Sequence, residues 1–472
     1  MHIRFLISKS ILFILFTFAV SVHAKAQDSS LVRYINPLVG TNSSKELSHG
    51  NTLPLVARPF GMTYWTPQTT ASNTDGWVYT YKANTISGFR GTRIPSPWMG
   101  DYGTFSIMPE VGQLELDAAK RASAFAHSKE IATPYSYKVE LEKYKVTTEY
   151  TATERCAYFK FNFPKSKNAY VVLDAFHGGS MVKVVPEENK VIGVCRNNTG
   201  GVPENFSGYF VAIFSKKFKG GTWITDTING DKLEAESDHV GAFVKFATDT
   251  TEPVFMRIGT SLISIEQAEL NLQREIGAKS FEEIKNESKI AWENEMQKIA
   301  IAGATEVQKT IFYTALYRTL LYPRMVYEYG VDSLPDYYSA FDGRIHEGFM
   351  YADNGLWDTF RGVFPFFSIM YPERHQEFCQ ALVDAYKEGG WLPRWLNPSY
   401  KEVMIGAHAA SLFADAYSKG LTKFDAATAY QGMLKDANES RPTGWMGRDG
   451  LKYYNKLGYT PTLIGESVYK TM

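Results

Sequence analysis

The apolar pattern of this 472-residue chain changes from strand-like to helix-like near residue 264. Four segments before that point alternate or run in β-branched and aromatic residues, with Gly, Asn, Asp and Pro clusters between them: residues 146–163, 170–176, 209–214 and 240–246. This pattern is typical of antiparallel strands. We therefore expect a large β-sandwich domain over residues 27–263.

Residues 264–303 have a different composition. Glu, Lys, Gln and Ala are frequent from residue 264 to 299, and Val, Thr and Pro are absent there. This composition fits a long polar-faced helix or a pair of helices. We predict a helical linker over 264–303 and place the domain boundary in it.

From residue 304 onward the pattern is helical. Thr305 and Gln308 form a capping box, and the apolar stripe that follows ends at Pro323. The stripe predicts these buried residues: Val307, Ile311, Phe312, Ala315, Leu316 and Leu320. Further helices are predicted over residues 374–388, 406–419 and 425–437. Helical hairpins with long connections indicate an α/α toroid, with about half of the helices needed to close one.

The last residues, 465–472, have the composition of an opening helix without a C-cap or turn signal. An unfinished toroid would expose an apolar edge to water. We therefore expect the sequence to be a fragment of a longer protein.

The N-terminus carries a predicted export signal. Arg4 and Lys9 precede an apolar run over residues 11–22, and Ala24 and Ala26 supply a small-x-small cleavage site. We predict a signal peptide over 1–26 and a periplasmic or extracellular mature chain. No later segment has 18 consecutive apolar residues, so no transmembrane anchor is expected.

Charge and cysteine usage exclude several classes of partner. The 50 basic and 50 acidic side chains balance, so the chain has no net field to attract nucleic acid, and none is predicted as a partner. Cys156, Cys195 and Cys379 are widely separated and odd in number. They argue against a disulfide scaffold or a zinc ribbon and are expected to be buried free thiols.

Residues 354–399 combine a core helix with aromatic and charged residues. Four apolar residues fall at i, i+3, i+4 and i+7, as on one buried helix face: Phe378, Ala381, Leu382 and Ala385. Trp357, Asp358 and Arg361 precede this helix, and Trp391, Arg394 and Trp395 follow it. We expect these flanking residues to line a pocket.

The residue types in this pocket suit a sugar. A pyranose has an apolar face that stacks on Trp, and its hydroxyls bind carboxylate and guanidinium groups. The alternative is that Trp357 and Trp391 are core aromatics, while Asp358 and Arg361, at i and i+3, form a local helix pair.

Several sequence blocks occur in order between residue 34 and residue 472: YINPLVGT, HGNTLPLVARPFGMTYWTPQT, GFRGTRIPSPWMGDYG, FYTALYRTLLYPR, GLWDTFRGVFPFFSIMYPER, GGWLPRWLNP, MIGAHAASLFADAYSKG and GESVYKT. In these blocks the chain resembles glycoside hydrolase family 92, the calcium-dependent exo-α-mannosidases. The resemblance implies an N-terminal antiparallel β-sandwich, a helical linker and a C-terminal (α/α)6 barrel. Residues 304–472 would then be the N-terminal part of that barrel, and the active site would lie where the domains meet.

The resemblance also implies a reaction. An exported enzyme of this family would hydrolyse terminal mannose from glycans with inversion, here of the α-1,2 type, using a carboxylic acid and a water-activating carboxylate on opposite faces of the sugar. Calcium is the implied cofactor, because a hard cation can bind mannose O2 and O3. The family's catalytic carboxylates and calcium ligands follow the GESVYKT block, so both sets are expected beyond Met472.

On this view the 472-residue chain alone is expected to be inactive. The alternative function is a non-catalytic fragment that at most binds carbohydrate weakly. A sandwich-plus-toroid phosphorylase is disfavoured because its motifs differ.

The resemblance assigns substrate-binding roles to particular residues. Trp357 and Asp358 match the family's Trp-Asp pair that contacts the terminal mannose, with Asp358 holding ring hydroxyls rather than donating the proton. Trp391 and His408 also match, His408 alternatively being a buried helical residue.

Two loops of the sandwich are expected to reach toward the same site. His49, Gly50 and Asn51 match one of them, and a tight turn is the alternative. Trp98, Asp101 and Tyr102 match the other, and a Pro-stiffened surface loop with a buried Trp is the alternative. Two positions depart from many relatives, Arg93 in place of His and Ala407 in place of Asp or Thr, and both are expected to bear on the linkage or aglycone accepted.

Overall fold

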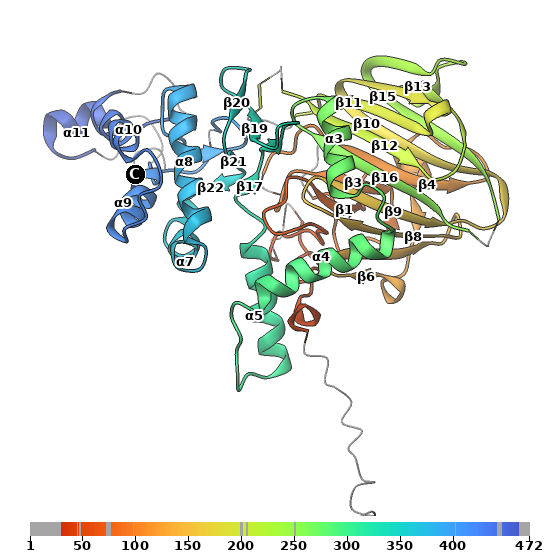
Figure 1. Cartoon of the computed structure of the whole chain (residues 1–472), viewed down its shortest axis with the longest axis horizontal. Coiled ribbons are helices and arrows are strands. Elements are labelled where there is room, and N and C mark those ends of the chain that lie inside the picture. Colours follow the sequence, from red (N-terminus) through yellow and green to blue (C-terminus); the bar gives the residue numbers. More distant parts are fainter. Residues whose placement is uncertain are drawn as a thin grey trace, which may run out of the picture.

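The computed structural model describes residues 30–461, apart from residues 45, 47–48, 72–76, 98, 199–201, 204–205, 250–251, 402 and 441–445. A sheet domain and a group of helices lie side by side, with short strands between them (Figure 1). None of the helices in the described ranges is both long and apolar enough to cross a bilayer. The predicted signal peptide and the predicted terminal helix lie outside the described residues.

Fourteen antiparallel strands of the described residues form one continuous sheet. Its main path runs β1-β3-β4-β10-β11-β12-β16-β9-β8-β7-β6, and β15, β13 and β14 branch from β10. The bounds are β1 (Tyr64–Gln68), β3 (Gly88–Thr92), β4 (Phe105–Val111), β6 (Ile131–Ala132), β7 (Ser136–Leu141), β8 (Val146–Ala152), β9 (Cys156–Asn162), β10 (Ser166–Val185), β11 (Lys190–Cys195), β12 (Gly208–Phe214), β13 (Lys219–Ile224), β14 (Thr227–Ile228), β15 (Glu234–Thr248) and β16 (Val254–Ser261). The shorter β2 (Thr85–Ile86) pairs with β5 (Ser123–Ala124).

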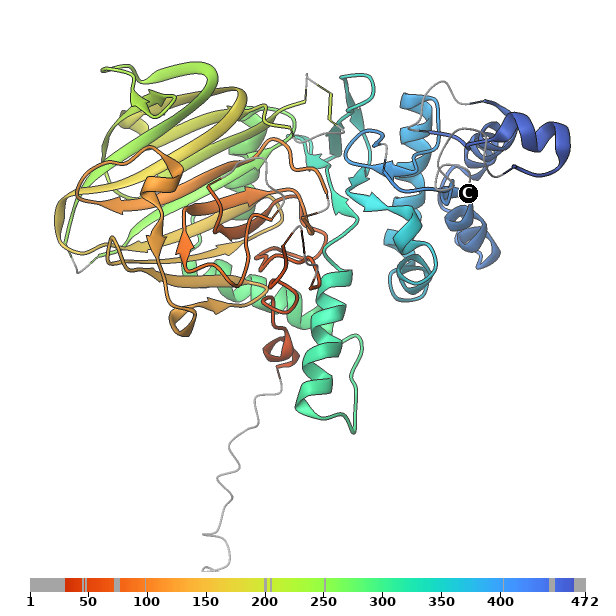
Figure 2. The ribbon, with the colours of Figure 1, turned by 180° about the vertical axis from the view of Figure 1, so that it is seen from behind.

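The sheet folds back on itself into two layers that share an aromatic core. The Trp65 ring of β1 packs edge-on against Phe105 of β4 and Phe159 of β9, at centroid distances of 5.8 and 5.4 Å. Figure 2 shows the orange strands of the first half of this domain lying over its yellow and green strands. The four strand segments predicted from the sequence lie in β8 and β9, β10, β12 and β15, and are confirmed.

Two helices follow the sheet, α3 (Ile265–Glu275) and α4 (Phe281–Met296). The sequence composition was compatible with either one helix or two, and the structure has two. The chain breaks between them at Gly277, which has a left-handed φ of +52°. Helix α3 lies on β12 and β16, and α4 is anchored by Trp292, whose Nε1 donates to the Ala57 carbonyl at 2.7 Å. Both helices therefore pack on the sandwich.

Helix α5 (Glu306–Thr319) begins at the predicted capping box of Thr305 and Gln308, which is confirmed. The predicted buried stripe is wrong in part, because Val307 and Ile311 are 69% and 65% exposed and Ala315 is exposed as well. The buried face is turned toward the N-terminal segment and carries Tyr313, Leu316, Tyr317 and Leu320.

Tertiary contacts explain which face of α5 is buried. The Tyr313 ring stacks on Tyr34 of the 3-10 turn η1 (Leu31–Tyr34) at 5.7 Å. Tyr317 donates its hydroxyl to the Leu55 carbonyl at 2.7 Å. Apolar side chains occur around most of this helix, so periodicity alone does not select the buried face.

The C-terminal half consists of helices joined by short strands. The helices are α6 (Leu356–Thr359), α7 (Val363–Met370), α8 (Pro372–Gly389), α9 (Ala409–Ser418), α10 (Ala426–Asn438) and α11 (Leu451–Leu457). The strands are β17 (Arg324–Met325), β18 (Glu328–Tyr329), β19 (Pro335–Tyr338), β20 (Ile345–Glu347), β21 (Tyr351–Ala352), β22 (Asn354–Gly355) and β23 (Trp395–Leu396). The three helices predicted after residue 370 are confirmed, and α9 begins later than expected because Met404 and Gly406 adopt left-handed φ values of +62° and +84°.

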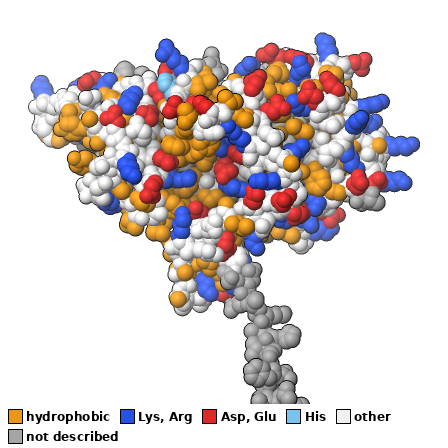
Figure 3. Space-filling model, viewed as in Figure 1, with side chains coloured by type: hydrophobic (Ala, Val, Ile, Leu, Met, Phe, Trp, Pro, Cys, Tyr) orange, Lys and Arg blue, Asp and Glu red, His pale blue; other side chains and the backbone are white. Residues whose placement is uncertain are grey.

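Buried side chains bear out the predicted core helix. Phe378, Ala381, Leu382 and Ala385 are all buried on α8. The three cysteines are also buried and free, as predicted. The chain thus has an antiparallel β-sandwich, a helical connection and an incomplete (α/α)6 barrel, and the face in Figure 3 carries interspersed charges of both signs.

Candidate functional site

Trp357 and Asp358 lie on α6, a single helical turn that starts directly after β22. Strand β22 pairs with β23, and Gly355 lies so close to β23 that an added Cβ would be 2.5 Å from the Trp395 ring. Thr359 closes the turn by donating its hydroxyl to Asn354 Oδ1 at 3.1 Å and to the Gly355 carbonyl at 2.9 Å. The turn that carries the Trp-Asp pair is therefore held at both ends.

The two residues of the pair have different environments. Trp357 is half-buried, and Asp358 is exposed. Partial burial raises the pKa of the Asp358 carboxyl. Among the described residues, this carboxylate has neither a hydrogen-bond donor nor an ion-pair partner.

Arg361 does not form the local helix pair with Asp358. Its guanidinium lies over the rings of Trp357 and Phe360, at 5.6 and 4.7 Å from the centroids. This stacking leaves the carboxylate open, so the local ion pair of the alternative interpretation is not formed.

His408 lies beside the same turn. Its ring stacks on Phe360 with centroids 4.1 Å apart and planes 8° apart. Burial, and then the positive charges of Arg361, Arg394 and Arg448, lowers the pKa of the His408 imidazole. The ring is therefore neutral near pH 7, and it covers one face of the Phe360 ring.

Two residues near the Trp-Asp pair were not among the predicted site residues. Phe360 stacks on His408. Its one sequence signal was its position three residues after Trp357, which places both residues on the same face of a helix. Burial, and then the negative charge of Asp358, raises the pKa of the Tyr322 hydroxyl, so Tyr322 lies near that carboxylate. Tyr322 precedes Pro323 in a different block of sequence, and no local pattern pointed to it.

Trp391 is placed elsewhere. It is 7% exposed, its backbone N–H donates to the Tyr400 hydroxyl at 3.0 Å, and the Lys435 ammonium lies 4.7 Å from its ring centroid. Its contacts within the described residues do not include α6. The packing alternative describes this tryptophan.

The loop at residues 49–51 forms a tight turn. The backbone N–H groups of His49 and Asn51 donate to Ser43 Oγ at 2.7 and 3.1 Å. Gly50 has φ of +111°, and a Cβ there would lie 2.6 Å from the Gly40 Cα. His49 and Gly50 are exposed, and the tight-turn alternative describes the local geometry of this loop.

The second sandwich loop is partly described, since Trp98 lies outside the described residues. Asp101 is buried, with an ion pair to Arg90 at 3.2 Å and a hydrogen bond from the Arg93 backbone N–H at 2.9 Å. Tyr102 is buried too, and its hydroxyl reaches Asp353 in the C-terminal half. This loop therefore approaches α6 through the interior of the junction.

The two departures from the family pattern differ in position. Arg93 is buried and donates to the Met62 carbonyl at 3.3 Å, and burial together with the charge of Arg324 lowers its pKa to about 10. Ala407 is half-buried next to His408. Arg93 therefore lies in the protein interior, and Ala407 lies near α6.

The described side chains do not fit a calcium site. Within the ranges that the structure describes, no group of three or more His, Cys, Asp and Glu side chains is arranged to hold a metal. Asp358 has aromatic and basic residues as its neighbours, whereas calcium takes six to eight oxygen ligands. The described side chains therefore give calcium no place beside Asp358.

Comparison with known proteins finds two models of one family along the chain. The model of the glycosyl hydrolase family 92 N-terminal domain matches residues 34–261, and that of the family 92 catalytic domain matches residues 267–472. A search of curated proteins gave no match.

Solved structures resemble the chain along most of its length. A family GH92 inverting mannosidase from Bacteroides thetaiotaomicron is 42% identical with a TM-score of 0.89, and the match covers 92% of this chain and 59% of that one. A second family GH92 α-mannosidase of that organism is 27% identical with a TM-score of 0.81, covering 92% and 60%. The complex of this second enzyme with mannoimidazole is 26% identical to the chain with a TM-score of 0.79. That match covers 92% of this chain and 58% of the other.

The chain thus spans about three fifths of the length of these relatives. The catalytic-domain match gives no support to the prediction that the reacting carboxylates lie beyond Met472, which stays a prediction. Two domain models of one family, matched in order over 34–261 and 267–472, together with 42% identity to a solved member, show that the chain belongs to glycoside hydrolase family 92.

Proposed function

We propose that this chain forms the mannose-binding part of an exported, exo-acting α-mannosidase that removes terminal mannose from glycans with inversion, of the α-1,2 type. One observation carries the proposal. Half-buried Trp357 lies beside the exposed carboxylate of Asp358 on a turn held at both ends. Family membership and the inverting mannosidase relative support the reaction.

Each side chain has a task in this proposal. The Trp357 ring stacks on the apolar face of the terminal pyranose, and the open Asp358 carboxylate accepts hydrogen bonds from its hydroxyls. The Arg361 guanidinium lies over the Trp357 ring and donates to sugar hydroxyls at the edge of that ring. Asp358 acts as a binding group, and a separate acid and base would perform the inversion.

Calcium and export belong to the same proposal by family resemblance. The calcium ligands would lie outside the described side chains, which form no suitable oxygen-rich group. Export rests on the predicted cleavage site at Ala24–Ala26. Mass spectrometry of the mature protein and its N-terminal peptide tests export, with Gln27 expected as the first residue.

The test of the site is a binding titration. Mannoimidazole, the ligand of the solved relative, is titrated into the purified chain by calorimetry. Asp358→Asn is expected to raise the Kd about tenfold or more, because a hydrogen bond to a charged group contributes about 1.5–3 kcal/mol. The melting temperature is expected to stay unchanged, since Asp358 is exposed and unpaired among the described residues.

The matched control is Asp231→Asn, the same chemical change at an exposed position between β14 and β15. It is expected to leave the Kd unchanged. Equal affinity of the Asp358→Asn variant and the parent chain would refute the proposed site.

A non-catalytic carbohydrate-binding chain is the second candidate. It is favoured by the state of Asp353, which precedes α6 by a few residues and is buried in an ion pair with Arg324 at 2.5 Å. A carboxylate held in this way is not available to activate water.

A further inference from the structure

Three buried side chains from different parts of the chain meet where the sandwich joins the helices. Arg324 of β17 donates through Nε to Asp353 Oδ2 at 2.5 Å and through Nη2 to the Tyr102 hydroxyl. Tyr102, from the sandwich loop, donates that hydroxyl to Asp353 at 3.1 Å. All three are at most 1% exposed. We call Tyr102, Arg324 and Asp353 the junction triad.

The junction triad is tied to the sandwich on its other side as well. Arg324 Nη1 donates to the Met62 carbonyl at 2.6 Å, just before β1. The Arg324 guanidinium also lies 5.5 Å from the Tyr102 ring centroid. The guanidinium thus contacts two sandwich segments and one segment of the helical half.

Asp353 leads directly into the turn that carries the Trp-Asp pair. It has a left-handed φ of +62°, and its backbone N–H donates to the Leu396 carbonyl of β23 at 2.7 Å. Residues 354 and 355 form β22, and α6 begins at Leu356. Only three residues therefore lie between Asp353 and Trp357.

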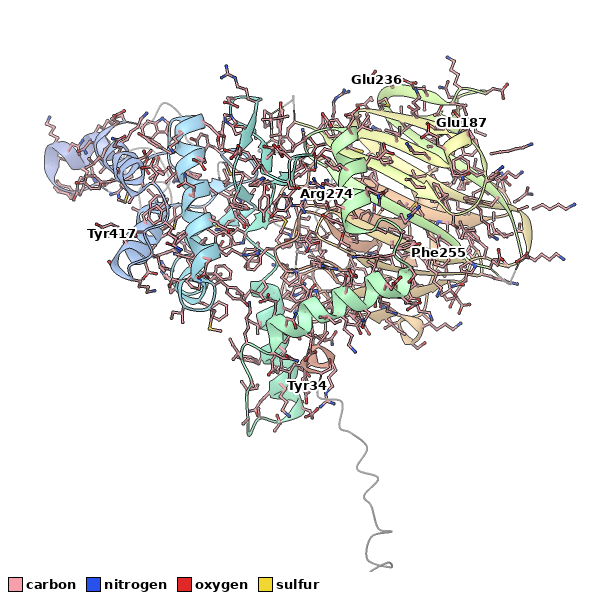
Figure 4. All side chains as sticks on the ribbon, viewed as in Figure 1. Tyr34, Glu187, Glu236, Phe255, Arg274 and Tyr417 are labelled. Carbon is pink, nitrogen blue, oxygen red and sulfur yellow. The ribbon has the colours of Figure 1, made fainter. Side chains whose placement is uncertain are left out.

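A second tether joins the same strand pair to the same sandwich loop. Asn397, just after β23, is buried and donates through Nδ2 to the Gly100 carbonyl at 3.2 Å. The loop that carries Gly100 and Tyr102 thus holds both strands beneath α6. A third cross-domain contact runs from Arg274 of α3 to the Tyr329 carbonyl at 2.6 Å, close to the junction in Figure 4.

From this geometry we propose that the junction triad is a positioning device, through which the sandwich sets the orientation of Trp357 and Asp358 toward a sugar. The proposal rests on the proposed function for its binding consequence. A buried charge pair holds its geometry tightly, because a displaced partner would leave an unpaired charge in the interior. Tyr102 is the side chain of the sandwich that bonds directly to Asp353.

The first test follows the indole of Trp357 without any ligand. The chain is labelled with 5-fluorotryptophan, and the resonance of Trp357 among the nine tryptophans is assigned with Trp357→Phe. Tyr102→Phe removes one hydroxyl from the junction triad and is expected to shift or broaden that resonance. The control Tyr150→Phe in β8 removes a buried hydroxyl that has no hydrogen-bond partner among the described residues, and is expected to leave the resonance in place.

The second test measures affinity for mannoimidazole. Tyr102→Phe is expected to raise the Kd about threefold to tenfold, the effect of losing one hydrogen bond that aligns the site, whereas Tyr150→Phe leaves it unchanged. If the parent chain does not bind mannoimidazole, the proposed function fails, and the fluorine resonance alone decides the positioning role.

Folding is checked by circular dichroism. Should Tyr102→Phe not fold, Asn397→Leu removes the second tether and is expected to move the same resonance. An unmoved Trp357 resonance in a folded Tyr102→Phe or Asn397→Leu chain would overturn the proposal. An equal shift caused by Tyr150→Phe would overturn it too.

Discussion

His375 shows how a single buried residue ties the stability of this chain to pH. It lies on α8 at 0% exposure, packed against Phe364 at a centroid distance of 5.9 Å. Both ring nitrogens lack a hydrogen-bond partner among the described residues. Burial lowers the pKa of the imidazole to about 4, with Asp415 and Lys419 as the charged groups nearby.

The direction of the pH effect follows from that pKa. Above pH 6.5 the imidazole is neutral in the folded and unfolded chain, so its contribution to stability is fully present. As the pH falls toward 4 the unfolded chain binds the proton and the folded chain does not, so stability is lost. The loss attributable to His375 amounts to about 3 kcal/mol and ends near the folded-state pKa.

Replacing this residue tests the prediction. His375→Leu is expected to lose less stability than the parent chain between pH 7.5 and pH 5, measured by urea unfolding followed by circular dichroism. His346→Leu, at a partly exposed histidine paired with Asp342, serves as the control. Parallel pH curves for His375→Leu and the parent would show that the buried imidazole does not cause the acid sensitivity.

At the scale of elements, close backbone approach fixes how α3 lies on the sheet. Gly259 of β16 faces α3, and a Cβ added there would be 2.3 Å from the Ala268 carbonyl oxygen. Gly259→Ala is therefore expected to destabilise the fold by about 1–3 kcal/mol, as overpacking does in other cores. Urea unfolding measures the change.

The matched control is Gly362→Ala before α7. Its φ is −130°, and no atom lies within 4 Å of an added Cβ among the described residues. It is expected to change the free energy of unfolding by less than about 0.5 kcal/mol. If both alanine variants unfold at the same urea concentration, the contact between α3 and β16 is looser than the structure indicates.

For the whole molecule, the decisive property is release of mannose. Inverting hydrolysis needs two carboxyl groups about 6.5–9.5 Å apart on opposite faces of the sugar. Asp358 is open, but the neighbouring carboxylate of Asp353 is buried against Arg324. We therefore predict that the 472-residue chain binds mannoimidazole yet releases no mannose from α-1,2-mannobiose, with or without calcium.

Mannose release is measured by NMR, which also reports the anomer formed. A longer family 92 protein that removes mannose from the same disaccharide serves as the positive control. Release of β-mannose by the 472-residue chain would place the acid and base within these residues.

Much of the architecture was predictable because its signals are local. The strand segments, the capping box at Thr305 and the buried face of α8 follow from spacing within a few turns of chain. Trp357 and Asp358 were found in the same way, from residue types that suit a sugar and from the family blocks around them.

Other features depended on contacts that leave no local pattern. Which face of α5 is buried was decided by Tyr34 and Leu55, far away in the chain. Trp391 had the residue type of a sugar platform, but Lys435 and Tyr400 enclose it.

The sequence by itself therefore determined the order of sandwich and helices, the family and the Trp-Asp pair, because periodicity, capping and motif identity are written in neighbouring residues. Only the tertiary structure decided how that pair is held. Tyr102 and Asp353 are 251 positions apart in the sequence. They come together only when folding buries both side chains, because polar groups removed from water form hydrogen bonds within the protein.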